Sequence, residues 1–244
     1  MIISDQPVNL PNGLRIYLSS KDDGSMLDRS KDIHAPEIVK HRREFCAANS
    51  IDYENVVYQE IVYGDEQSYE TLQEVGFGHT THTIPGVQAD GLFTSEIGVG
   101  LFLPVADCVA TIVYDPRKQL LAILHLGRHS TLTRLVAKTV DHFIGYGSRP
   151  SELLVWMSPS AKRETYKLEW FNHVDNSAWQ GFFETKDDGI YIDLPGYNQQ
   201  QFISAGVLAE NITISPIDTT NNPNYFSHRA GDTTDRIAVL AMMR

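Results

Sequence analysis

The chain has 244 residues and a formal net charge of −11, with 42% hydrophobic and 21% charged residues, proportions ordinary for a folded globular protein. An acidic chain without a visible basic stripe argues against nucleic acid or an anionic membrane as its partner. The two cysteines, Cys46 and Cys108, cannot make a disulfide framework and fit a reducing compartment.

The amino-terminal stretch lacks a basic region followed by a long apolar core, so it does not read as a signal peptide. No apolar run approaches the about 18 residues that a membrane-spanning helix needs. We therefore expect a cytoplasmic protein, with residues 1–244 forming one domain.

Short runs rich in β-branched residues and bounded by turn residues predict strands. They cover residues 14–19, 56–63, 98–105, 109–114, 119–125, 153–157, 212–214, 226–229 and 237–242. Apolar residues at helical spacing predict helices over residues 33–49, about 131–143 and about 195–205. Strands and helices alternate without a dominant βαβ period, which indicates a mixed α/β fold.

The stretch 87–143 carries the strongest chemical signal. Its two central strands are joined by Asp-Pro-Arg-Lys at 115–118, a credible hairpin turn. If Tyr114 pairs with Gln119, Cys108 lies directly opposite His125. Opposed residues have Cβ atoms roughly 4.5–5.5 Å apart. The sequence therefore predicts either a thiolate–imidazole pair or two ligands of one metal ion.

The same residues also have simpler interpretations. A cysteine in a strand is usually a buried apolar residue, and a lone histidine is usually structural. Cys46 shares a helix face with apolar residues, so we expect it to be core packing. His125 ends its strand at a tight turn, and Ser130 or Thr131 can cap the helix that follows.

Several motifs resemble those of the laccase-domain family, whose members have been described as polyphenol oxidoreductases, purine nucleoside phosphorylases and peptidoglycan-editing factors. The similar blocks are Ala-Asp-Gly-Leu-Phe-Thr at 89–94, Ala-Asp-Cys at 106–108, His-Leu-Gly at 125–127 and Phe-Ser-His-Arg at 226–229. Weaker blocks extend the resemblance over most of the chain. It implies layered α/β/β/α architecture with mixed sheets, similar to deamidating toxins that use a Cys–His pair.

The resemblance also implies a zinc ion on three protein ligands and a small-molecule substrate, a purine nucleoside with phosphate. Cys108 and His125 match two of the ligands, and an open position on zinc would activate water. Tyr63 stands at the third position, where a phenol is a poor zinc ligand at neutral pH. Arg229 matches a family arginine and is the candidate for gripping a phosphate or carboxylate.

His79 or His82 could replace the missing ligand if their loop folds back, although solvated loop histidines are the favoured interpretation. Other family positions also differ, namely Lys21, Arg128, Asp218 and Ala230. Arg128, which starts the helix after His125, is a second candidate for binding an anion. With so many supporting residues replaced, we expect a partly degenerate site and slow turnover of adenosine or inosine.

Three functions remain open at this point. The first is a zinc-dependent purine nucleoside phosphorylase or deaminase. The second is a metal-free hydrolase or amidase in which Cys108 is the nucleophile and His125 its base. The third is an inactive relative that serves as a binding protein. Multicopper oxidase chemistry is the weakest interpretation, because the chain has no His-x-His pair.

Overall fold

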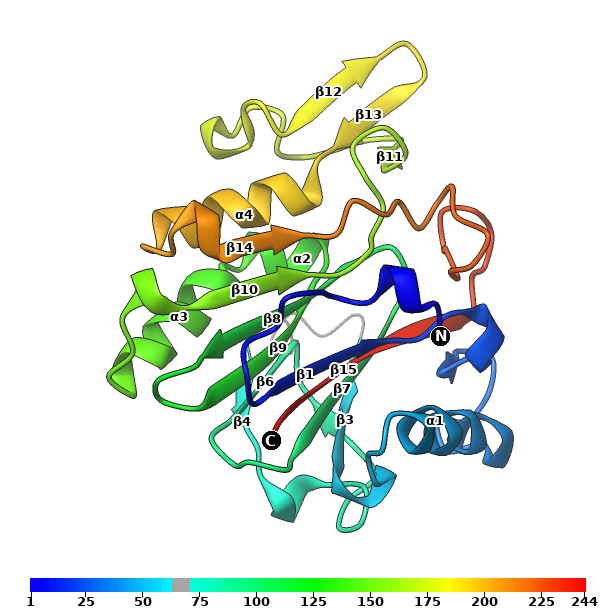
Figure 1. Cartoon of the computed structure of the whole chain (residues 1–244). Helices are drawn as coiled ribbons and strands as arrows, with labels where there is room; N and C mark the ends of the chain where they lie inside the picture. Colours follow the sequence, from blue (N-terminus) through cyan, green and yellow to red (C-terminus); the bar gives the residue numbers. More distant parts are fainter. Residues whose placement is uncertain (63–70) are drawn as a thin grey trace.

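The protein is built from two large sheets stacked face to face, with helices on both outer sides (Figure 1). The computed structural model describes residues 1–62 and 71–244. Within these residues, the strands form two six-stranded sheets and one three-stranded sheet.

The first large sheet is mixed and has the order β1-β15-β7-β3-β5, with β2 paired to one end of β15. The last strand, β15, lies between β1 and β7 and runs antiparallel to both, so the two ends of the chain meet in this sheet. β3 runs parallel to its neighbours β5 and β7. The strands are β1 (Leu14–Leu18), β2 (Leu27–Asp28), β3 (Val56–Glu60), β5 (Val87–Gln88), β7 (Gly100–Val105) and β15 (Asp235–Met243).

The second large sheet has the order β14-β10-β8-β9-β6-β4. Every residue of its central hairpin, β8 and β9, is buried, which explains why both strands read as continuous apolar runs. The strands are β4 (Leu72–Glu74), β6 (Gly91–Thr94), β8 (Val109–Asp115), β9 (Leu120–Leu126), β10 (Leu154–Met157) and β14 (Ile212–Ile214).

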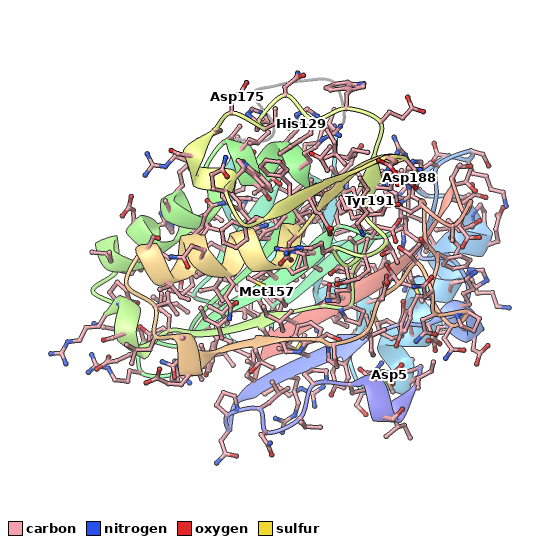
Figure 2. The ribbon with its side chains drawn as sticks, turned by 90° about the horizontal axis from the view of Figure 1, so that it is seen from above. Asp5, His129, Met157, Asp175, Asp188 and Tyr191 are labelled. Atoms are coloured by element: carbon pink, nitrogen blue, oxygen red, sulfur yellow. The ribbon has the colours of Figure 1, made fainter. Side chains whose placement is uncertain are left out.

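A small antiparallel sheet, with the order β11-β13-β12, projects beyond the two large ones (Figure 1). The Tyr191 hydroxyl donates a hydrogen bond to Asp188 at 2.9 Å beside its hairpin turn (Figure 2). Lys167 contacts the same carboxylate at 2.8 Å. These contacts hold the tip together. The strands are β11 (Lys167–Leu168), β12 (Phe183–Lys186) and β13 (Gly189–Ile192).

Three apolar clusters lie between the layers. One fills the space between the two large sheets, a second joins the first sheet to α1, and a third joins the second sheet to α3 and α4. The helices are α1 (Pro36–Ala48), α2 (Arg128–Leu132), α3 (Leu135–Gly145) and α4 (Leu194–Ser204). The expected α/β/β/α layering with mixed sheets is therefore confirmed. In the part of the chain that the structure describes, we find no helix with the length and apolar character that a membrane crossing requires.

The register of the central hairpin differs from the prediction by two residues. Tyr114 pairs with Leu121, and Ala110, not Cys108, pairs with His125. The turn keeps four residues but lies one residue later, at 116–119. The Asp115 carboxylate accepts the N–H groups of Arg117 and Lys118, and Asp115 stays in the strand opposite Leu120. Cys108 therefore precedes β8. A shift of two residues keeps a side chain on the same face of a sheet.

Two further predictions about the elements are wrong. Residues 226–229 form a loop rather than a strand, because the Ser227 side chain and backbone bond to Ala230 and Asp232 and close the chain on itself. The helix expected over 131–143 is two helices, separated at Arg134, whose φ of 63° is left-handed. Gly127 is the N-cap of α2, and Ser130 reaches back to its N–H.

Candidate active site

Cys108 and His125 come together at the end of the central hairpin, beside Gly127. A Cβ atom built on Gly127 would lie 3.3 Å from Cys108 Sγ and 3.4 Å from His125 Nε2. Both atoms therefore border the space that the missing side chain leaves open. His125 is buried, whereas Cys108 is half-buried. The two side chains share one face without the direct cross-strand opposition that the sequence predicted.

Asp90 holds the other side of the imidazole. Its Oδ1 lies 3.0 Å from His125 Nδ1, and its carbonyl accepts the His125 N–H at 2.8 Å. Asp90 occupies this place because it directly precedes β6, in which Gly91 pairs with Leu124. The result is a continuous contact from carboxylate to imidazole to sulfur, which fixes the orientation of the ring.

The charge on His125 follows from these neighbours. Burial by itself lowers the pKa of the imidazole, but the negative charge of Cys108 and the hydrogen bonds with Asp90 and Cys108 raise it, with a net pKa of about 9. The protonated ring is thus favoured at neutral pH.

Asp107 anchors the loop that carries Cys108. Its backbone is left-handed, with φ of 68°, a conformation that non-glycine residues rarely adopt. The carboxylate accepts the Thr219 hydroxyl at 2.7 Å and the Arg229 N–H at 2.7 Å. One buried carboxylate therefore connects the cysteine loop to the loop of Arg229 and stabilises the strained backbone.

The cysteine and histidine open into a cavity of about 290 Å³. This volume is at the lower end of the range for small-molecule sites, which is roughly 300–1,000 Å³. His129 is exposed at its edge and lies, viewed from above, on the same side of the molecule as Asp175 (Figure 2). Besides His125, the basic lining residues in the described part of the chain are Arg29, Arg128, His129, His228, Arg229 and Arg236.

Tyr166 and Trp170 supply aromatic surface next to these cations. The Arg229 guanidinium lies 4.5 Å from the centre of the Tyr166 ring, and Arg229 Nη1 donates to the Lys167 carbonyl at 2.7 Å. Burial, together with the negative charge of Cys108, raises the pKa of Tyr166 to about 12, against the opposing effect of the arginines. Trp170 is 61% exposed, and its ring is 6.0 Å from the Arg128 guanidinium.

The structure thus brings together Cys108, His125, Arg128 and Arg229, and it places two other candidates elsewhere. His79 is exposed beside Glu96 in a separate surface hollow. His82 lies 3.7 Å from Glu54. Neither histidine borders the cavity that contains Cys108.

The cavity offers fewer ligands than a zinc ion needs among the described residues. A catalytic zinc takes three protein ligands, and in the described part of the chain Cys108 and His125 provide two. No group of three or more His, Cys, Asp or Glu side chains within residues 1–62 and 71–244 could hold a metal ion. Tyr63, at the third family position, lies outside the described residues. The described donors alone do not complete a zinc site.

Residues 25–244 match the family described as multi-copper polyphenol oxidoreductase laccase. The chain belongs to this family. Among curated relatives, it is 25% identical over 200 residues to the purine nucleoside phosphorylase YlmD of Bacillus subtilis, covering 79% of this chain and 72% of that protein. It is 23% identical over 235 residues to a purine nucleoside phosphorylase of Borreliella burgdorferi, covering 94% and 86%.

Solved structures similar to this chain agree with the fold. The Bacillus licheniformis hypothetical protein YfiH aligns with a TM-score of 0.82 at 22% identity, covering 96% of this chain and 94% of that one. YlmD from Geobacillus stearothermophilus aligns with a TM-score of 0.78 at 23% identity, covering 96% and 93%. At these identities the likeness shows the shared fold.

Several residues of the site give no readable signal in the sequence. Asp90 was visible in the Ala-Asp-Gly-Leu-Phe-Thr block, but only the pairing of β6 with β9 shows that it contacts His125. Asp107 stood beside Cys108, and its left-handed backbone gave no sequence signal. Arg29 and Arg236 lie more than 200 residues apart in the chain, so nothing local predicted that both line the cavity.

Proposed function

We propose that the chain is an enzyme that cleaves a purine nucleoside with phosphate, producing the free base and ribose 1-phosphate. One observation carries the proposal. Cys108 and His125, the latter in contact with Asp90, line the same cavity as Arg128 and Arg229. The names of the related proteins, purine nucleoside phosphorylases, support the choice of substrate.

The arginines bind the phosphate, since the guanidinium fork matches phosphate oxygens. A phosphate oxygen then attacks the ribose C1′, a C1′–O bond forms and the C1′–N9 bond breaks. The bonding electron pair leaves with the base, and His125 Nε2 donates a proton to the purine. Asp90 keeps the ring oriented, and the raised pKa of His125 keeps the ring protonated until transfer. The attacking hydrogen phosphate loses its own proton as ribose 1-phosphate forms, and this proton returns through water to His125.

Zinc dependence remains a prediction. In the family resemblance Cys108 and His125 are zinc ligands, but the described donors number two, and no step above passes through a metal ion. Metal content after purification, measured by elemental analysis, tests this point directly. One bound zinc per chain would mean that a third ligand completes the site. An active protein that contains no zinc would support the metal-free route.

A second candidate function is a thiol hydrolase or amidase. The same contact chain, from Asp90 through His125 to Cys108, is the arrangement in which a histidine activates a cysteine nucleophile. In that reaction Cys108 Sγ attacks an acyl carbon, His125 donates the proton to the leaving amine, and water hydrolyses the thioester. A protein inactive with both substrate classes would leave the third interpretation, a binding protein.

The deciding experiment incubates the purified chain with inosine, with and without phosphate, and quantifies hypoxanthine and ribose 1-phosphate. We expect phosphate-dependent release of both products that is lost in Cys108→Ala. Cys46→Ala is the matched control, because it removes the other thiol from the cluster between α1 and the first sheet. Base release without phosphate dependence would contradict the phosphorylase proposal, and turnover that survives Cys108→Ala would contradict the site.

A further inference from the structure

An exposed indole stands beside the cavity. Of the three tryptophans in the chain, Trp156 and Trp179 are 7% and 0% exposed, whereas Trp170 is 61% exposed. A single exposed aromatic side chain is ordinary on a protein surface, so exposure alone assigns it no role. The role of Trp170 follows from its neighbours.

Two contacts place Trp170 at the mouth of the cavity. Its ring centre lies 6.0 Å from the guanidinium of Arg128, which lines the cavity. Three residues earlier in the chain, the Lys167 carbonyl accepts a hydrogen bond from Nη1 of Arg229 at 2.7 Å, and Arg229 also lines the cavity. The segment that carries Trp170 is therefore tied to both arginines that we assign to phosphate.

The core fixes this segment on both sides of Trp170. Leu168 and Phe171 are each 5% exposed and belong to the apolar cluster that joins the second large sheet to α3 and α4. The Phe171 ring meets the buried Trp179 ring edge-on, with centroids 5.0 Å apart. The indole of Trp170 thus projects from an anchored stretch of backbone.

The indole is open to a ligand. A guanidinium 6.0 Å from the ring centre is at the limit of a cation–π contact, so Arg128 leaves the ring available. An aromatic ring beside cationic groups is the combination with which proteins hold a base and its phosphate, because every base offers a π-face. The cavity, at about 290 Å³, is at the lower end for small-molecule sites, so a nucleoside bound together with phosphate would reach its mouth.

We propose that Trp170 is the platform on which the purine base of the substrate stacks. With its five-membered ring toward His125, the base extends its six-membered ring to the mouth of the cavity and onto the indole. This inference rests on the proposed function and specifies how the base is recognised. Trp170 touches no reacting atom, so it contributes to binding of the nucleoside and not to the chemical step.

The test is a titration of the chain with inosine in the absence of phosphate, where the proposed reaction cannot proceed. Indole fluorescence is excited at wavelengths that inosine does not absorb. We expect saturable quenching, and we expect it to be absent in Trp170→Phe, because the two remaining tryptophans are buried.

Calorimetry of the same titration measures the affinity. Trp170→Ala should weaken inosine binding about 5–150-fold, the effect of removing one stacking aromatic ring from a base, and Trp170→Phe should restore most of the affinity. Phe77→Ala is the matched control, because Phe77 is an exposed aromatic residue, 48% accessible, that does not line the cavity. It should keep wild-type affinity.

Steady-state kinetics separate stacking from a merely structural role. We expect Trp170→Ala to raise the KM for inosine while kcat and the KM for phosphate keep their wild-type values, because the base is held equally in the ground state and the transition state. A raised KM for phosphate with unchanged inosine binding would mean that Trp170 only positions Arg128, and would overturn the proposal.

The outcomes also separate this inference from the proposed function. Phosphate-dependent cleavage of inosine, with wild-type affinity in Trp170→Ala, would overturn the stacking site and leave the phosphorylase proposal standing. Inosine that binds and quenches Trp170 but is not cleaved when phosphate is added would overturn the phosphorylase proposal and support the stacking site. No detectable binding of inosine would overturn the stacking site.

Discussion

Replacing Asp90 with asparagine should lower the pKa of His125 while leaving the imidazole ring in place. The substitution keeps a side-chain oxygen near Nδ1, at present 3.0 Å away, but removes the negative charge. The pKa of His125 is raised from 6.5 to about 9, a difference equivalent to about 3 kcal/mol in favour of the imidazolium. Cys108 and Asp90 share this contribution, so we expect the pKa to fall in Asp90→Asn. Loss of such an orienting partner typically lowers activity about 10–100-fold.

The pKa of His125 can be followed by NMR titration of the imidazole, and the activity by kcat/KM against pH. Because the raised pKa favours the folded state, its contribution to stability is complete below pH 6.5 and is lost as the pH rises through about 9. Unfolding free energies of Asp90→Asn should depend less on pH in this window. Asp115→Asn is the matched control, a buried carboxylate at the far end of β8. An unchanged His125 pKa in Asp90→Asn, or an equal loss of activity in Asp115→Asn, would refute the reasoning.

Three further predictions concern the cavity and its support. Gly127→Ala places a methyl group 3.1 Å from the His125 ring and 3.3 Å from Sγ of Cys108, and should lower kcat/KM by up to about a hundredfold; Gly145→Ala, which meets open space, should keep wild-type kinetics. Iodoacetamide at neutral pH should label Cys108 alone, because burial raises the pKa of Cys46 to about 12. Equal labelling of Cys46 in the folded chain, detected by mass spectrometry, would contradict this prediction. Thr219→Val removes the hydroxyl that donates to the buried Asp107 carboxylate and should lower the free energy of unfolding in urea by about 1–3 kcal/mol. Thr219→Ser should lower it less, and equal losses in the two variants would count against a stabilising role of this hydrogen bond.

The layers of the fold could be predicted because its strands are strongly patterned. The buried hairpin of β8 and β9 reads as apolar runs on both sides of a turn, and α1 begins at Pro36. The register could not be predicted, because it depends on the Asp115 carboxylate accepting two turn N–H groups and on Gln119 adopting φ of 53°. The prediction that Cys108 lies near His125 holds despite the different register, because a shift of two residues keeps a side chain on the same face of the sheet.

The rest of the site depends on contacts between distant segments. Asp90 reaches His125 through a strand pairing that has no local sequence signal. Arg29 and Arg236 line the same cavity because β2 pairs with the end of β15. The composition does not indicate a basic cavity, because the whole chain has a net charge of −11. The pattern at 226–229 predicts a strand, but hydrogen bonds at Ser227 hold these residues, Arg229 included, in a loop.

The central claim is that phosphate and a purine ribosyl group react in the cavity of Cys108 and His125. The most direct measurement is a ³¹P NMR time course of the purified chain with phosphate and inosine, alongside Cys108→Ala. We predict a growing anomeric ribose-phosphate signal that matches the release of hypoxanthine and is absent in Cys108→Ala. Release of hypoxanthine with no change in the phosphate signal, or an equal signal in Cys108→Ala, would contradict the account.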